Sequence, residues 1–159
     1  MAGRPTRTSI KERARDDLFA PLGISDMEWR HYPNGEVAAA SGLRLRPRDL
    51  AKIGQMVLDL GTWRSRRIVS ASWIEQSSSP QIHGEGLFFY GFQWWIGRSF
   101  FRGREINWFQ GAGYGGQALI IVPSLGIVPV VTTGRYHNQP PYNVNILILN
   151  RYILPAVLD

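Results

Sequence analysis

The sequence predicts an α+β fold in which an antiparallel sheet is flanked by helices. Three observations lead to this fold class. Capping residues and apolar side chains at helical spacing recur before residue 80. From residue 88, four stretches rich in aromatic and β-branched residues follow one another through short turns. The segment 140–159 then returns to helical spacing, so helices precede and follow the sheet.

The first predicted helix begins after Ser9 and ends before Pro21. Ser9 and Glu12 have the spacing of a capping box, in which each side chain accepts a hydrogen bond from the other residue's backbone N–H. Apolar residues at positions 10, 14, 18 and 19 lie near helical period. The segment 24–46 has no clear periodicity, and we interpret it as a structured loop.

Two more helices are predicted before the sheet. Pro47 suits the first turn of the second helix, and Gly61 suits its end. One face of that helix carries Leu50, Ile53, Val57 and Leu58. The third helix is short, and Pro80 closes it.

Four strands are predicted, over 88–97, 104–111, 117–123 and 126–133. Because the links between them are short, neighbouring strands are expected to run antiparallel in a meander. Trp94 and Trp95 are neighbours on the first strand, so their side chains are expected on opposite faces, one in the core and the other in a pocket or on an exposed face. The final helix is expected to cover the sheet with Val144, Leu147, Ile148 and Ile153.

Length and composition indicate one domain over residues 1–159. The chain is 44% hydrophobic and 19% charged, and it contains no cysteine. Disulfides, thiolate metal sites and cysteine nucleophiles are therefore excluded. No apolar run approaches the roughly 18 residues of a membrane span. The start "MAGRPTRTSIKERARDD" lacks the apolar core of a secretory signal peptide, which leaves the cytoplasm as the default location.

The formal net charge of +6 comes almost wholly from arginine. The arginines are interspersed with acids, as in "KERARDD" and "RLRPRD", which is typical of a solvated surface. The sequence shows no zinc-finger spacing, no aromatic RNA-binding motif and no clear helix-turn-helix. We therefore expect no nucleic-acid partner.

The most unusual segment is "GAGYGGQ", residues 111–117, which precedes a predicted strand. Four of its first six residues are glycine. A glycine-rich segment at this position is often a tight turn or bulge. Alternatively, glycine lets the backbone approach a ligand closely.

Three stretches in one order carry a resemblance to a known family. They are "LFAPLGISDMEW", "SGLRLRPRDLAKIGQMVLDLGTWRSRRIVSASWIEQS", and "YGFQWW" followed by "GAGYGGQALIIVPSLGIVPVVTTG". Together they resemble the C-terminal part of the serine β-lactamase-like family, which includes class C β-lactamases, penicillin-binding DD-peptidases, family VIII esterases and 6-aminohexanoate-dimer hydrolases. The resemblance covers the chain from about residue 9 to its end and implies the C-terminal part of the DD-peptidase-like fold.

The resemblance implies a substrate-binding segment. Family members use a nucleophilic Ser in S-x-x-K, a Tyr in Y-x-N, and a third motif, K-T-G or H-x-G, on a sheet strand. By position, Gly111, Ala112 and Gly113 match the third motif, with Gly111 in place of the basic or imidazole residue. The motif continues through Tyr114, Gly115, Gly116 and Gln117. These seven residues are predicted to bind substrate, with a backbone N–H completing an oxyanion hole.

The nucleophile motif of that family is missing, since no S-x-x-K occurs in the chain. The segments 32–34 and 136–138 fit Y-x-N but lie in the wrong place relative to "PLG", and we interpret both as chance. His31, His83 and His137 share no metal-ligand spacing. No catalytic residue, metal site or cofactor is therefore assigned.

Two functions remain open at this point. The first is the C-terminal portion of a serine hydrolase acting on esters or amides, inactive alone because the S-x-x-K half of the domain is absent. The alternative is a non-catalytic module that binds a small acyl compound, a peptide or a protein. An incomplete fold leaves a sheet edge exposed, so the expected partners are an N-terminal half or a second copy of the chain.

Overall fold

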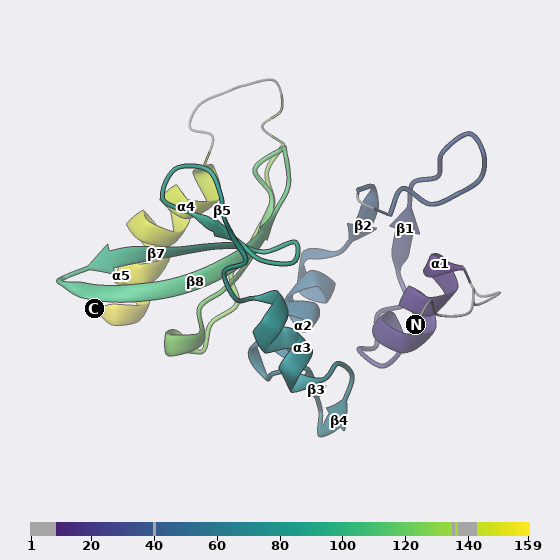
Figure 1. The fold of residues 1–159 in the computed structure, drawn as a ribbon, viewed down its shortest axis with the longest axis horizontal. Helices are drawn as coiled ribbons and strands as arrows, with labels where there is room; N and C mark the ends of the chain where they lie inside the picture. The colour runs from purple at the N-terminus through teal and green to yellow at the C-terminus, as the bar shows by residue number, and fades with distance from the viewer. Residues whose placement is uncertain (1–8, 40, 135, 137–142) are drawn as a thin grey trace.

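The computed structural model describes residues 9–39, 41–134, 136 and 143–159 (Figure 1). Its centre is a six-stranded antiparallel sheet of order β10-β9-β8-β7-β6-β5. The strands are β5 (Ile82–His83), β6 (Phe89–Tyr90), β7 (Trp95–Phe101), β8 (Arg104–Ala112), β9 (Ala118–Ile121) and β10 (Val130–Val131). Because each strand pairs with the next along the chain, the sheet is a meander, and the predicted α+β fold is confirmed.

The predicted strand 88–97 is in fact a hairpin. Phe89 of β6 pairs with Ile96 of β7, and the chain turns between Gly91 and Trp94. Gln93 in this turn has a φ of 67°, a left-handed conformation that favours glycine or asparagine. Neither residue occupies that position, so the sequence carries no signal for the turn.

The interpretation of 24–46 as a loop is wrong, because two short strands pair within it. They are β1 (Met27–Trp29) and β2 (Leu43–Leu45). The indole N–H of Trp29 donates to the Ala38 carbonyl at 3.1 Å, which fixes the loop between them. Strands of three residues are too short to show the alternation that sequence analysis depends on.

A second hairpin was not predicted. It joins β3 (Thr62–Trp63) to β4 (Arg66–Arg67) through Arg64 and Ser65, whose φ angles are 45° and 66°. Two consecutive left-handed residues are the geometry of a type I′ turn, which is usually Asn-Gly. Arginine and serine do not carry that signal.

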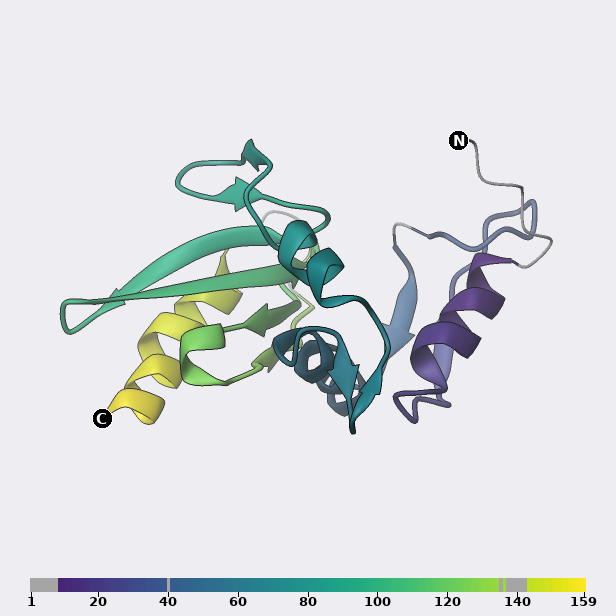
Figure 2. The same cartoon turned by 60° about the horizontal axis from the view of Figure 1, so that its bottom comes forward.

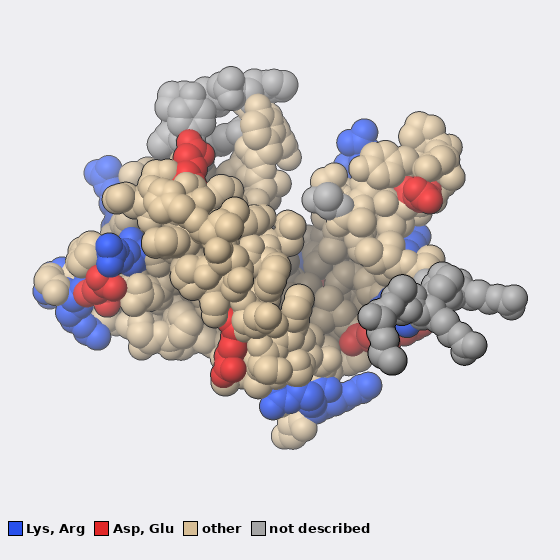
Figure 3. All heavy atoms as spheres, in the orientation of Figure 1, with Lys and Arg blue, Asp and Glu red and all other residues tan. Residues whose placement is uncertain are grey.

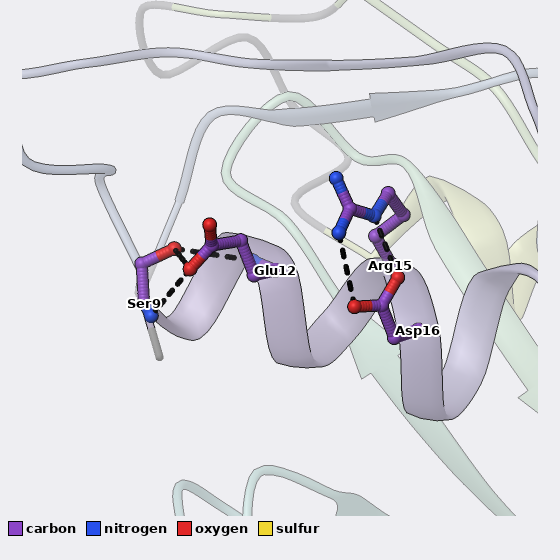
Figure 4. Close-up of polar contacts among 4 residues, drawn as sticks. All are labelled: Ser9, Glu12, Arg15 and Asp16. Atoms are coloured by element: carbon purple, nitrogen blue, oxygen red, sulfur yellow. Dashed lines mark hydrogen bonds and ion pairs between the residues drawn. The ribbon is translucent and has the colours of Figure 1, made fainter. Parts of the chain in front are cut away.

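The first helix begins with the predicted capping box (Figure 4). The Ser9 hydroxyl accepts from the Glu12 N–H at 3.2 Å, and the Glu12 carboxylate accepts from the Ser9 N–H at 2.8 Å. The Ser9 hydroxyl also donates to the Glu12 carboxylate at 2.9 Å. The hydrogen bonds that the carboxylate accepts, first from the Ser9 backbone and then from the Ser9 hydroxyl, lower the pKa of Glu12. The cap therefore contributes above the ordinary carboxyl pKa and is lost as the pH falls through the lowered value.

The same helix continues beyond its first turn as a π-helix. It consists of α1 (Ile10–Arg13) and the π-helical η1 (Ala14–Phe19). Arg15 and Asp16 form a two-bond ion pair on its surface (Figure 4), and the Arg15 hydrogen bond lowers the pKa of Asp16. Phe19 is buried in the core, whereas Ile10 is exposed. The described helix ends before Pro21, as predicted.

Helices cover both faces of the sheet, as Figure 2 shows. On one face lies α2 (Pro47–Leu58), with α3 (Ala71–Ser77) beside it. Gly54 of α2 lies directly against Val128 and Leu119, where a Cβ atom would overlap the Val128 side chain. A first hydrophobic core lies on this face and includes residues of the N-terminal segment. It consists of Phe19, Leu22, Ile24, Trp29, Met56, Val57, Ile74, Leu119 and Ile121.

The opposite face packs against the C-terminal helix (Figures 1 and 2). This helix runs through α4 (Val144–Ile148), the π-helical η3 (Leu149–Ile153) and α5 (Leu154–Leu158). The prediction that Leu147 packs on the sheet is wrong, because Leu147 is 45% exposed. Leu149 and Leu154 of this helix are buried instead. The π-helical turn bonds residues five apart and so shifts the buried face relative to a regular α-helix.

Strand β9 is buried on both sides. Leu119 and Ile121 belong to the first core. Ala118 and Ile120 belong to a second core, which lies between the sheet and the C-terminal helix and consists of Ile106, Trp108, Ala118, Ile120, Val122, Val131, Leu149 and Leu154. Alternation along the strand thus separates the two cores. None of the helices in the described ranges is long and apolar enough to cross a membrane.

Candidate functional site

The seven predicted binding residues lie together at the hairpin between β8 and β9. Gly111 and Ala112 end β8, and the residues from Gly113 to Gln117 form the connecting turn. The Gly113 N–H donates to the Gln117 carbonyl at 2.9 Å, and the Gly116 N–H donates to the Gly113 carbonyl at 2.9 Å. Most of the glycine-rich segment is therefore a turn, and only its first two residues belong to a strand.

The end of β8 is open on one side. Trp95, the first residue of β7, pairs with Gln110, so the register with β7 stops before Gly111. On its other side Gly111 pairs with Leu119 of β9. Since the Gly113 N–H points toward β9 and backbone groups alternate along a strand, the N–H and C=O of Ala112 point toward the open side. The edge thus offers a backbone donor and acceptor that no strand in the described ranges uses.

A pocket of about 350 Å³ lies on the α2 face of this edge. Trp94 forms one wall, and its ring meets Phe109 edge-on at 5.2 Å between centroids. The lining residues are Leu50, Gln93, Trp94, Gly111, Gly113, Gln117, Ala118 and Leu119. The pocket is mostly apolar, with Gln93 and Gln117 among its lining residues, and this suits a short acyl chain. We call it the Trp94 pocket.

A second pocket, of about 440 Å³, is lined by Trp95 and Ala112. Its other lining residues are Glu85, Gly86, Phe88, Gln110 and Asn143. The side chain of Gln110 bonds Asn145 of the C-terminal helix, which places this pocket on the opposite face of the sheet. Trp94 and Trp95 therefore point to opposite faces, as predicted, and each lines a pocket. We call the second one the Trp95 pocket.

The glycines of the turn have different roles. Gly116 has a φ of 82°, and a Cβ atom there would lie 2.7 Å from the Thr133 hydroxyl and 2.9 Å from Val144. The Thr133 hydroxyl also donates to the Gly115 carbonyl. At Gly111, by contrast, a Cβ atom would meet only Trp94, at 3.8 Å. Glycine is thus required by the fold at position 116, whereas at position 111 it leaves room in the Trp94 pocket.

This difference predicts unequal effects of alanine on stability. Gly111→Ala is expected to change the free energy of unfolding by less than about 0.5 kcal/mol. Gly116→Ala is expected to cost about 2 kcal/mol, because it combines left-handed strain with overpacking. Urea unfolding followed by circular dichroism measures both. An equal loss in the two variants would mean that Gly111 is also a structural requirement.

Tyr136 of the second Y-x-N match lies at this turn, with its ring centroid 6.2 Å from that of Tyr114, whereas the other described candidates lie outside the site. Tyr32 is exposed in the loop between β1 and β2, and His31 bridges to Val37 in that loop. His83 on β5 meets the Phe89 ring edge-on at 5.5 Å. His137 and Asn138 fall outside the described residues. Within the described ranges no group of three His, Cys, Asp or Glu side chains is placed to hold a metal ion.

Sequence reasoning missed Gln93 as a lining residue. Gln93 has a left-handed conformation in the turn before β7, and it lines the Trp94 pocket together with Gly111 at the end of β8. The Tyr90 hydroxyl donates to the Gln93 side-chain oxygen at 3.3 Å. Only a turn signal at residues 91–94 would have revealed this position.

Charged side chains do not gather over the face shown in Figure 3. Basic and acidic groups lie in small sets around its margin, and most of the centre carries neither sign. This agrees with the interpretation of the arginines as a solvated surface.

Comparisons with known proteins agree with this geometry. The family model described as Beta-lactamase matches residues 1–151. A Bacillus anthracis structure whose name assigns it as a 6-aminohexanoate-dimer hydrolase is similar with a TM-score of 0.78 and 25% identity, covering 95% of this chain and 39% of that one. A penicillin-binding protein homologue from Caulobacter crescentus has a TM-score of 0.62 and 15% identity, covering 85% of this chain and 50% of that one. The comparison with curated protein sequences found no match.

The chain thus spans half or less of the length of either similar structure. The second similarity concerns the fold alone. The matched region includes β8, β9 and both pockets, so the candidate site lies within the part that is shared with the family model.

Proposed function

The chain belongs to the beta-lactamase family, and from this premise we propose that it forms the acyl-binding C-terminal portion of a serine hydrolase that cleaves esters or amides. The observation that carries the proposal is the open edge of β8 at Ala112, beside the Trp94 pocket. Acyl transfer by a serine requires a site that holds the acyl group and a donor that stabilises the oxyanion. The edge and the pocket are suited to these two tasks.

In this proposal the substrate carbonyl lies along the open edge of β8. The Ala112 N–H donates to the carbonyl oxygen as the serine oxygen adds to the carbonyl carbon and the oxyanion forms. The acyl chain lies in the Trp94 pocket, where Gly111 leaves room for it. When the carbonyl re-forms, the bond to the leaving alcohol or amine breaks, and the leaving group takes up a proton.

The serine and its base belong, in this proposal, to a part of the fold that these 159 residues do not contain. No S-x-x-K occurs in the sequence, and the chain corresponds to 39% of the similar hydrolase structure. We therefore expect the chain alone to bind acyl compounds without cleaving them. The name of that structure makes a linear amide of a six-carbon acid the first substrate class to test.

The partner in this proposal docks at the sheet edge formed by β10. Among the described strands, Val130 and Val131 pair with β9 alone, so the backbone on their other side is proposed to pair with a further strand. A complementary N-terminal portion is the expected occupant, with a second copy of the chain as the competing one.

The first test is hydrolysis by the purified chain. A short-chain nitrophenyl ester and a chromogenic cephalosporin are incubated with the wild type and with Tyr114→Phe. We expect no turnover above the rate without protein in either case. Turnover that depends on Tyr114 would show that a nucleophile is present in this chain and would refute its inactivity.

Binding is tested separately, by the indole N–H signals of ¹⁵N-labelled protein during titration with N-methylhexanamide. The Trp94 signal, assigned from Trp94→Phe, is expected to shift. Gly111→Val should remove the shift because its side chain fills the pocket, whereas Phe100→Ala, an exposed change at the far end of β7, should retain it. No Trp94 shift in the folded wild type would contradict the acyl site.

A further inference from the structure

We propose that the Trp95 pocket is a binding site for an organic ammonium group. The pocket has a volume of about 440 Å³, aromatic walls and a single charged lining residue, Glu85, among the described ones. It lies on the opposite face of the sheet from the Trp94 pocket. Its occupancy by a cation therefore does not depend on the proposed hydrolase function.

Two fixed rings form the walls. Trp95 meets Tyr90 edge-on at 4.8 Å between centroids, and Phe88 packs on the buried Trp108 at 5.7 Å. The backbone approaches both rings closely at glycines. A Cβ atom at Gly84 would lie 3.0 Å from the Trp95 ring, and one at Gly97 would lie 3.0 Å from the Phe88 ring. The rings are thus held in place before any ligand arrives, which reduces the entropy lost on binding.

The carboxylate is carried by a closed turn. The Gly84 N–H donates to the Phe88 carbonyl at 2.8 Å, and the Phe88 N–H donates to the Glu85 carbonyl at 3.2 Å. Gly86 has a φ of 61°, which this tight turn requires. Glu85 is therefore presented from a defined backbone beside the two rings.

Among the described residues, none forms an ion pair with Glu85, so its carboxylate can receive a cation from solution. In the described part of the chain, the ion pairs use Asp16, Asp26, Glu28, Asp49, Glu105 and Asp159. A cation near a carboxylate and over aromatic faces gains from both the charge and the ring quadrupoles. The chemistry of the pocket consequently favours positive ligands.

An ammonium group fits these walls better than a metal ion. Calcium takes six to eight oxygen ligands, and magnesium demands octahedral oxygen coordination. Here one carboxylate is accompanied by the amides of Gln110 and Asn143, while the Gln110 oxygen already accepts from Asn145. Aromatic walls offer no ligand to such metals, but they do attract alkylammonium groups.

Ala112 connects this site to the open edge of β8, because it lines the Trp95 pocket and ends the strand. A compound with an acyl group in one pocket and an ammonium group in the other would span the edge. This extension rests on the proposed function, whereas ammonium binding itself does not.

The test is a titration of ¹⁵N-labelled chain with tetramethylammonium chloride, with sodium chloride as the ionic-strength control. The Trp95 indole signal, assigned from Trp95→Phe, is expected to shift, and the Trp94 signal is not. Glu85→Gln should weaken binding at least about tenfold, since an interaction with a charged group is lost. Glu75→Gln, an exposed change on α3 outside the pocket, should bind as the wild type does.

Two results would overturn the proposal. Equal affinity of the wild type and Glu85→Gln would show that the carboxylate plays no part. Equal affinity for tert-butanol, the neutral molecule of similar shape, would show an apolar pocket without charge preference. The Trp94 indole signal reports on the acyl site, and the Trp95 indole signal reports on the ammonium site. If one signal does not shift, the result for the other site can therefore still be interpreted.

Discussion

Replacing Trp108 with alanine is expected to lower the free energy of unfolding by about 4 kcal/mol. Trp108 is 1% exposed and lies in the second core, between the sheet and the C-terminal helix. Its indole N–H donates to the Ser99 hydroxyl at 2.9 Å, and that hydroxyl donates to Asn150 at 2.6 Å. Alanine would leave a large cavity and remove the donor that Ser99 accepts from. Urea unfolding measures the loss.

Two matched variants separate the causes of that loss. Trp73→Ala removes a tryptophan that is 49% exposed, and a change below about 1 kcal/mol is expected. Trp108→Phe keeps most of the buried ring but loses the hydrogen bond to Ser99, so an intermediate loss of about 2 kcal/mol is expected. If Trp108→Ala cost no more than Trp73→Ala, the C-terminal helix would not pack on the sheet as described.

The second large effect is expected at Gly61, where alanine should cost about 3 kcal/mol or more. Gly61 follows α2 with a φ of 86°, and its N–H donates to the Met56 carbonyl at 2.8 Å. Its carbonyl accepts from Ile68 at 2.8 Å and from Val69 at 3.1 Å. A Cβ atom would overlap the Val69 carbonyl oxygen, which is backbone and cannot move independently. Thermal or urea unfolding of Gly61→Ala measures the cost.

Gly126→Ala is the matched control for this prediction. Gly126 has a φ of 63°, but nothing lies within 4 Å of the Cβ position. Its alanine variant should lose only the strain of a left-handed residue, about 1 kcal/mol. Equal losses at the two positions would mean that Val69 does not approach Gly61 as closely as described.

Local features of the chain could be predicted where residues close together in the sequence determine them. Ser9 and Glu12 form the expected capping box, and Gly61 follows the second helix in a left-handed conformation. Both depend on residues only a few positions apart. The hairpins at 62–67 and 89–96 were missed because arginine, serine and glutamine adopt the left-handed conformation in their turns. Asn or Gly at such positions is the usual sequence signal for a turn.

The sequence predicted which segment forms the candidate site, but it did not predict how the residues of the site are arranged in space. The sequence identified residues 111–117 through their glycines and their resemblance to a family motif. It did not reveal that β7 begins opposite Gln110 and leaves Ala112 at an open edge. That edge depends on pairing with residues about fifteen positions away, which periodicity does not encode. The contribution of Glu85 to the Trp95 pocket likewise depends on contacts between separate segments.

The sequence by itself determined the fold class, the capping box of the first helix, the antiparallel meander of the sheet and the absence of S-x-x-K from these residues. Each follows from local backbone preferences or from residue identity. Only the tertiary structure decided which side chains of each face are buried and which line a pocket. The π-helical turn of the C-terminal helix exposes Leu147 and buries Leu149. Strand register places Trp94 and Trp95 in separate pockets. Both outcomes depend on packing between segments distant along the chain, where many weak contacts jointly select one arrangement.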